Sequence, residues 1–181
     1  MAKRKITLVL LAVLVISMVG LCACSSFRGG LLDKLTAEES KLIQERSDEI
    51  IRCLTENDKE SFRALFSEQA RKNDTFDQEV DSVFDFFSCE VYIKSEVVDT
   101  AGGETSSEDG ERKEWSVSPE ITYIEVLQKA DGDDEEMADR YYGVRYDWQI
   151  KDSDHPEREG LSHFEITLLN TDEKAEIGGQ G

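Results

Sequence analysis

Three residues in the second half of the chain carry side chains that could do acid–base chemistry. Arg145 and Asp147 lie two positions apart, so in an extended strand they would share one face. His163 is one of two histidines, and its side chain titrates near neutral pH. A positioned acid, base and cation predict an isomerase, a dehydratase or a hydrolase. The alternative is that all three residues simply face solvent.

Aromatic residues of the same predicted strands suggest a ligand pocket between sheet and helices. A concave apolar site with a few polar groups is the default hypothesis for ligand binding. The residues that we expect near its mouth are Tyr123, Arg145, Tyr146, Trp148 and His163. For Tyr146 and Trp148 the alternative is ordinary packing in the core of the sheet.

An acidic run offers oxygen ligands for calcium, but not at the spacing that a calcium loop needs. The run contains Asp131, Asp133, Asp134, Glu135 and Glu136. An EF-hand loop requires ligands at alternate positions and a glycine at the sixth. We therefore predict a solvated hairpin tip and no metal site. The chain also contains no phosphate-binding loop, zinc-type cysteine pair or nucleophile elbow, so we predict no cofactor.

The first half of the chain predicts three amphipathic helices. Thr36 to Glu39 has the form of a capping box. Apolar positions then recur at helical spacing. The expected buried positions are Ile43, Ser47, Ile50, Ile51 and Leu54 in the first helix; Phe62, Leu65, Phe66 and Ala70 in the second; and Phe76, Val80, Val83, Phe84 and Phe87 in the third. The aromatic stripe of the third helix is most simply core.

The second half predicts strands, because apolar residues there alternate. The expected strands are 91–97, 121–129 with Pro119 at its entrance, 142–150 and 161–169. Residues 101–113 are rich in glycine, serine and acids and predict a mobile loop. Residues 171–181 predict a frayed tail. Strands joined without intervening helices form an antiparallel sheet.

The formal net charge of −19 excludes one class of function. Nucleic-acid binding depends on cations that neutralise phosphate, so we predict no nucleic-acid partner. Fourteen of the fifteen aromatic residues lie between Phe62 and Phe164, enough to build a core. We therefore expect one folded domain.

The N-terminus predicts an export signal. Three basic residues, Lys3 to Lys5, precede an apolar run from Ile6 to Leu21, the order of a secretory signal peptide. An uncleaved membrane anchor is the alternative, since about 20 apolar residues can span a bilayer. Thr7, Ser17 and Gly20 interrupt the run, however, and favour a cleaved signal. Both interpretations place the following residues outside the cytoplasm.

The segment Leu21-Cys22-Ala23-Cys24 resembles the lipobox of bacterial lipoproteins. The resemblance implies that residues 1–23 are removed, that Cys24 carries the lipid, and that residues 24–35 are a tether. Removal of three cations takes the formal charge from −19 to −22. Cys53 and Cys89 then remain in a compartment that permits disulfides. They form either a bridge or two buried thiols.

The order of three helices and then a sheet looks like the cone fold of nuclear transport factors and ketosteroid isomerases. Four segments resemble an uncharacterised family of lipoproteins from Gram-positive gut bacteria: residues 48–58, 65–67, 83–87 and 157–161. The resemblance covers residues 38–169. It implies an α+β cone-fold domain over residues 36–171, with three N-terminal helices on a curved antiparallel sheet of about four strands. Residues 172–181 would be a flexible tail.

These observations predict a non-enzymatic binding or interaction module, lipid-anchored at the outer face of the cytoplasmic membrane. Its partner would be a small molecule or an envelope protein, and a homodimer through the sheet is a further alternative. The competing hypothesis is an enzyme that uses Asp147 or His163 in a buried pocket. A third is a structural spacer.

Overall fold

The computed structural model describes residues 37–129, 137–171 and 173–178. The chain divides into two compact units, Met1–Leu42 and Ile43–Gly181. Of the first unit only residues 37–42 are described, and they are helical. Cys24, the predicted tether and the acidic run at 131–136 all lie outside the described residues. The account below concerns the second unit.

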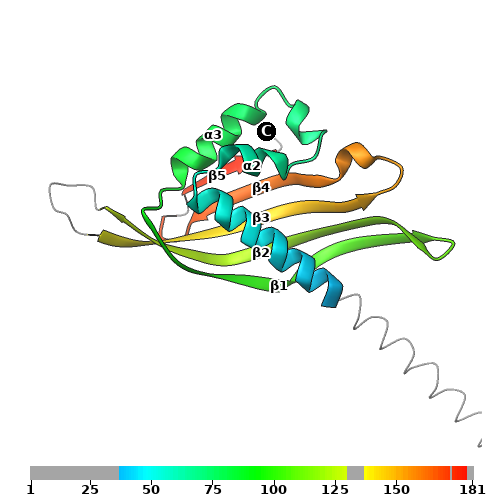
Figure 1. Cartoon of the computed structure of the whole chain (residues 1–181), viewed down its shortest axis with the longest axis horizontal. Helices are drawn as coiled ribbons and strands as arrows, with labels where there is room; N and C mark the ends of the chain where they lie inside the picture. Colours follow the sequence, from blue (N-terminus) through cyan, green and yellow to red (C-terminus); the bar gives the residue numbers. More distant parts are fainter. Residues whose placement is uncertain (1–36, 130–136, 172, 179–181) are drawn as a thin grey trace, which may run out of the picture. The chain divides into compact units, whose positions relative to one another are not determined.

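One antiparallel sheet dominates this unit (Figure 1). Its five strands lie in sequence order: β1 is Val91–Glu108, β2 is Glu111–Lys129, β3 is Met137–Asp152, β4 is Gly160–Leu168 and β5 is Glu173–Ile177. Each strand pairs with the next one along the chain. The sheet is therefore a meander, in which β1 and β5 form the two edges.

Helices cover one face of this sheet. The first helix continues to residue 55, followed by α2 (Lys59–Ala64), the short 3₁₀ helix η1 (Ala70–Lys72) and α3 (Phe76–Phe86). In β3 the side chains of Tyr142, Val144, Tyr146 and Trp148 are buried, whereas Arg145 and Asp147 between them are exposed. This alternation defines a covered face and an open face of the sheet.

Aromatic contacts join the helices to the covered face. Phe62 of α2 is fully buried and makes edge-to-face contacts with Phe66, Phe84 and Phe164, at ring-centroid distances of 5.1 to 5.4 Å. The hydroxyl of Tyr146 lies 2.9 Å from that of Ser47 in the first helix. Both residues are buried, so this bond satisfies two polar groups inside the core.

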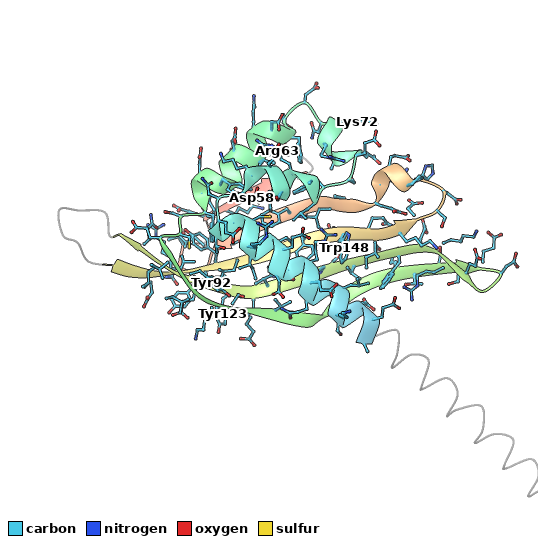
Figure 2. The ribbon with its side chains drawn as sticks, viewed as in Figure 1. Asp58, Arg63, Lys72, Tyr92, Tyr123 and Trp148 are labelled. Carbon is cyan, nitrogen blue, oxygen red and sulfur yellow. The ribbon has the colours of Figure 1, made fainter. Side chains whose placement is uncertain are left out.

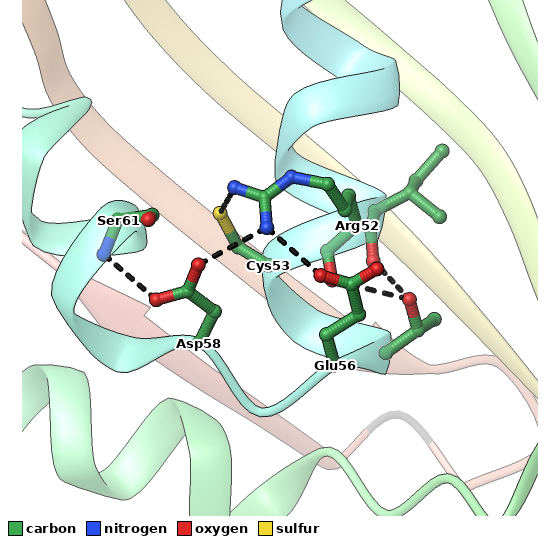
Figure 3. Close-up of polar contacts among 7 residues, drawn as sticks. Arg52, Cys53, Glu56, Asp58 and Ser61 are labelled. Atoms are coloured by element: carbon green, nitrogen blue, oxygen red, sulfur yellow. Dashed lines mark hydrogen bonds and ion pairs between the residues drawn. The ribbon is translucent and has the colours of Figure 1, made fainter.

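The junction between the first helix and α2 is fixed by a polar network (Figure 3). Asp58 caps α2 by accepting a hydrogen bond from the Ser61 amide at 3.0 Å. Its other carboxylate oxygen lies 3.0 Å from Arg52, which also contacts Glu56 at 2.9 Å. These bonds hold the pKa of Asp58 down at about 2. Asn57, between the first helix and α2, has a positive φ of 55°, a conformation common where helices end.

The predicted helices are present, and every apolar position expected in their buried stripes except Ala70 is buried. The predicted architecture of three helices on a curved sheet of about four strands, the cone fold, is nevertheless wrong. The sheet has five strands, and β1, β2 and β3 contain 18, 19 and 16 residues. Strand structure, not helix, dominates the unit.

The largest error concerns residues 101–113, which form the end of the β1–β2 hairpin and not a mobile loop. Their side chains from Gly103 to Glu111 are exposed on both faces, so no apolar alternation marks them as strand. The turn is Asp109-Gly110, with φ values of 52° and 83°. Aspartate followed by glycine is a strong hairpin signal. Pro119 accordingly lies inside β2, not at its entrance.

Two further boundaries differ from the prediction. The tail expected at 171–181 contains β5, whose Ile177 is buried opposite Phe164. The second helix ends at Ala64 instead of reaching Ala70. Beyond it, Phe66 forms a parallel bridge with Leu161 of β4, because packing of this apolar segment against the sheet outweighs its helical spacing.

Candidate functional site

A pocket among the described residues lies where the segment after α2 meets the ends of β4 and β5. It has a volume of about 420 Å³. Its lining residues are Ser67, Gln69, Ala70, Asn73, Phe76, Glu79, Gln149, Arg158, Ser162, Ile177 and Gly178. We call this cavity the β4–β5 pocket. It falls between the end of β5 and the bridge that Phe66 makes to Leu161.

The pocket has a buried floor and a polar rim. Ser67, Phe76 and Ile177 are 2%, 4% and 1% exposed, and they form the floor. Amide, hydroxyl and guanidinium groups line the exposed rim: Gln69, Asn73, Arg158 and Ser162. An apolar base with convergent hydrogen-bonding groups is the usual composition of a ligand site.

Backbone pairing builds one wall of the pocket. The Ser67 amide donates to the Leu161 carbonyl at 2.9 Å, and the Leu161 amide donates to the Leu65 carbonyl at 2.9 Å. The Gln69 amide also donates to the Glu157 carbonyl at 3.0 Å. Gly160 permits this approach: its φ is +123°, and a Cβ there would lie 2.6 Å from the Ser67 nitrogen. No other residue fits without a shift.

A carboxylate holds the opposite wall. Glu79 of α3 accepts a hydrogen bond from the Gly178 amide at 3.0 Å and another from the Thr75 hydroxyl at 2.6 Å. Each bond uses a different carboxylate oxygen. Glu79 thus ties the end of β5 to the start of α3, and its two oxygens are already engaged within the protein.

A buried carboxylate shapes the loop that presents the rim cation. Asp152 is 2% exposed and accepts hydrogen bonds from the amides of Asp154 and His155 at 3.2 and 2.9 Å. The short helix η2 (Pro156–Arg158) follows directly. Its last residue, Arg158, places its guanidinium 3.9 Å from the second oxygen of Asp152. That separation is too long for a hydrogen bond.

The structure separates the five residues predicted at a pocket mouth. Tyr146 and Trp148 lie on the covered face, where they are 1% and 7% exposed. The guanidinium of Arg46 stacks over Trp148 at 4.5 Å. Burial raises the pKa of Tyr146 to about 12, although its bond to Ser47 lowers it. Both residues are core, which was the alternative interpretation.

Tyr123, Arg145 and His163 lie on the open face instead. Together with Tyr146, Arg145 and His163 line a hollow of about 240 Å³. In this hollow His163 lies 3.7 Å from Asp147. Tyr123 lines a different hollow with Tyr141. Figure 2 shows Tyr123 and Trp148 at separate places along the sheet. The predicted acid and base do meet, but at side chains that are 52% and 30% exposed.

The remaining predicted sites have simpler outcomes. Cys53 and Cys89 are free thiols, and burial raises the pKa of each. No cluster of three or more potential metal ligands occurs within residues 37–129, 137–171 and 173–178. Among these residues there is also no helix that is long and apolar enough to cross a membrane.

Sequence reasoning did not find the β4–β5 pocket as a site. Two segments quoted for the family resemblance, Leu65–Ser67 and Glu157–Leu161, meet at its wall. Gly160 was the available signal, because a glycine directly before a predicted strand marks a turn or a close backbone approach. The pairing of these segments across more than 90 positions could not be read from their local patterns.

The fold and the pocket define a small antiparallel-sheet protein with helices on one face and a polar cavity at one end of β4. The chain belongs to the family described as Domain of unknown function (DUF5104), whose match covers residues 49–171. The match spans the end of the first helix, α2, α3, the pocket wall and β1 to β4. No curated protein matches the sequence significantly.

Proposed function

We propose that the chain is a lipid-anchored, extracytoplasmic binding protein that takes a small polar ligand in the β4–β5 pocket. The pocket itself is the observation that carries this proposal. Its volume of about 420 Å³ falls within the range of roughly 300 to 1,000 Å³ that ligand sites occupy. Its buried floor offers apolar contact, and its rim offers hydrogen bonds.

The placement outside the cytoplasm rests on the leader. Leu21-Cys22-Ala23-Cys24 has the lipobox pattern, and three basic residues precede the apolar run. Two acyl chains on Cys24 would give stable membrane anchoring, where one would not. The strongly acidic chain disfavours adsorption of the domain itself to anionic lipid, which suits a domain held at a distance by a tether.

A protein partner is the second candidate, supported by the edge strand β1. Val91, Tyr92 and Ile93 at its start are 42 to 46% exposed, and an unpaired strand edge can accept another strand. Register shifts follow closely, between Tyr92 and Lys94 and between Glu96 and Val97. Such bulges interrupt an edge and disfavour pairing. We therefore prefer the pocket to a homodimer through the sheet.

The catalytic alternative stays a prediction. It gains the contact between Asp147 and His163, but these side chains are 52% and 30% exposed, so water reaches them. Removing water is what strengthens acid–base and electrostatic chemistry in an enclosed site. An open pair of this kind is also what an ordinary solvated sheet face contains.

A pocket-filling variant tests the proposal. Ala70 lines the pocket on η1, so Ala70→Phe should fill it with little effect on the core. The full chain, purified in detergent, is screened by saturation-transfer NMR against D-galactose, D-galacturonate, N-acetyl-L-alanine and N-acetyl-L-alanine amide. We expect at least one probe to bind, and Ala70→Phe to weaken that binding about tenfold or more.

The matched control is Lys72→Phe, on the same short helix but outside the pocket lining. It should bind the probe as the wild type does. Unchanged binding by a folded Ala70→Phe variant would place the ligand elsewhere.

A further inference from the structure

The two charged groups of the β4–β5 pocket differ in how freely they can bind a ligand. Within the described residues, Arg158 and Glu79 are the ionisable groups that line it. The two oxygens of Glu79 already accept hydrogen bonds from Thr75 and Gly178. A ligand in the pocket therefore meets one cation, Arg158, and one carboxylate, Glu79. Both oxygens of that carboxylate already accept a hydrogen bond.

Unlike the Glu79 carboxylate, the Arg158 guanidinium has no hydrogen-bond partner among the described residues, so it can bind a ligand. Its nearest acidic group there is Asp152 at 3.9 Å. The side chain is 50% exposed, so it can reach a ligand at the rim. All five guanidinium N–H donors remain for a planar acceptor.

The loop fixes the direction from which Arg158 approaches the pocket. Asp152 is held by two backbone amides, so its free oxygen is a fixed negative point beside the guanidinium. The Arg158 amide donates to the His155 carbonyl at 2.9 Å, which closes the turn of η2. These bonds fix the backbone from which Arg158 extends, and its guanidinium can still turn toward a ligand.

From this geometry we infer that the pocket selects a small carboxylate, with Arg158 binding the carboxylate group and the neutral rim groups binding its hydroxyls or amide. The inference rests on the proposed function and names its ligand class. Arginine and carboxylate form paired, charge-assisted hydrogen bonds, which are stronger than neutral ones. A sugar acid and an N-acylated amino acid share this chemistry: one carboxylate beside several neutral polar groups.

The floor and rim complement the rest of such a ligand. Ser67 accepts a hydrogen bond from the Ala70 amide, and its own hydroxyl proton has no acceptor among the described hydrogen bonds. The side-chain oxygen of Asn73 accepts a hydrogen bond from the Thr75 amide at 3.3 Å, which leaves its amide protons for a ligand oxygen. Phe76 supplies the apolar surface below them. These groups favour a ligand with hydroxyl or carbonyl oxygens next to its carboxylate.

Matched pairs of probes test the inference. D-galacturonate is compared with D-galactose, and N-acetyl-L-alanine with N-acetyl-L-alanine amide, by titration of the full chain in detergent. We expect the acid of at least one pair to bind about tenfold or more tightly than its neutral partner. The pair that shows the preference distinguishes a sugar acid from an acylated amino acid.

Arg158→Gln should abolish the preference, whereas Arg158→Lys should retain part of it because the charge remains without the bidentate geometry. Arg145→Gln is the matched control, since it makes the same change in net charge on the open face and should leave the preference intact. Equal binding of acid and neutral probes would overturn the inference while the pocket proposal survives. A preference that persists in Arg158→Gln would also overturn it. If no probe bound, both proposals would fail.

Discussion

At the scale of single residues, the buried tyrosines of β3 fasten the helices to the sheet. The Tyr146 hydroxyl contacts that of Ser47 and donates to the Ile43 carbonyl at 3.4 Å. The Tyr142 hydroxyl likewise approaches the Phe86 carbonyl at 3.5 Å and accepts from the Ser88 amide at 3.4 Å. Each tyrosine thus gives a specific register to an otherwise apolar interface.

Replacing Tyr146 by phenylalanine should therefore destabilise the domain. The variant keeps the ring but leaves the buried Ser47 hydroxyl without this partner, and an unsatisfied buried polar group costs about 1 to 3 kcal/mol. Urea unfolding followed by tryptophan fluorescence would measure the loss. Tyr123→Phe, on the open face, is the control and should change stability by less than about 0.5 kcal/mol. If Tyr146→Phe and Tyr123→Phe lost the same stability, the hydrogen bond of the Tyr146 hydroxyl would not stabilise the domain as proposed.

The same residue gives a pH dependence with a defined sign. The folded pKa of Tyr146 is about 12, above its ordinary value of 10.0. The unfolded chain therefore loses this proton first, so the stabilisation is complete below pH 10 and is lost as pH rises toward 12. Unfolding free energies of the wild type should fall more steeply over this range than those of Tyr146→Phe. Parallel curves would contradict the assignment.

At the scale of elements, the junction of β4 with the segment after α2 builds the pocket wall. Gly160→Ala should disrupt it, because the new Cβ would meet the Ser67 nitrogen at 2.6 Å. Gly110→Ala is the control: it also has a positive φ, of 83°, but no atom lies within 4 Å of the added carbon. Both variants should lose roughly 1 to 2 kcal/mol from the unfavourable φ.

Gly160→Ala should lose more stability than Gly110→Ala. It should also lose probe binding in the pocket, which Gly110→Ala should keep. Thermal melts of the two variants, followed by the probe titrations, would measure both effects. If Gly160→Ala proved no more harmful than Gly110→Ala, the close approach of the two segments would not be needed for the fold.

Helices were easier to predict than strands because each α-helix buries one face, whereas β1 has no buried residue among its described side chains. The third helix carries Phe76, Val80 and Phe84 at regular spacing, and all three are buried. The tip of the β1–β2 hairpin, residues 103–111, is exposed on both faces, so its composition resembles that of a loop. β5 was missed for the same reason, since of its five residues only Ile177 is buried.

The candidate site was hardest to predict because it depends on long-range pairing. Its wall joins Phe66 to Leu161, and neither residue has a chemically distinctive side chain. By contrast, Arg145, Asp147 and His163 were predicted as site residues from their reactive side chains, but they lie on a solvated face. The reactive residue types lie on the open face of the sheet, while a glycine and backbone hydrogen bonds build the wall of the pocket.

At the scale of the whole molecule, we propose a chain that is exported and lipid-anchored and whose domain binds a small ligand. The proposed role of the pocket, binding of an extracytoplasmic ligand, requires the domain to lie outside the cytoplasm. In this proposal residues 1–23 direct export, and Cys24 directly after them carries the lipid.

The most direct test is metabolic labelling of bacteria with an alkynyl fatty acid, comparing Cys24→Ala with Cys22→Ala in the full chain. We expect the wild type and Cys22→Ala to carry the label, to lack residues 1–23 by mass spectrometry, and to be digested by protease added to intact spheroplasts. Cys24→Ala should carry no label. A labelled Cys24→Ala protein, or an intact leader on a protein that external protease cannot reach, would contradict the account.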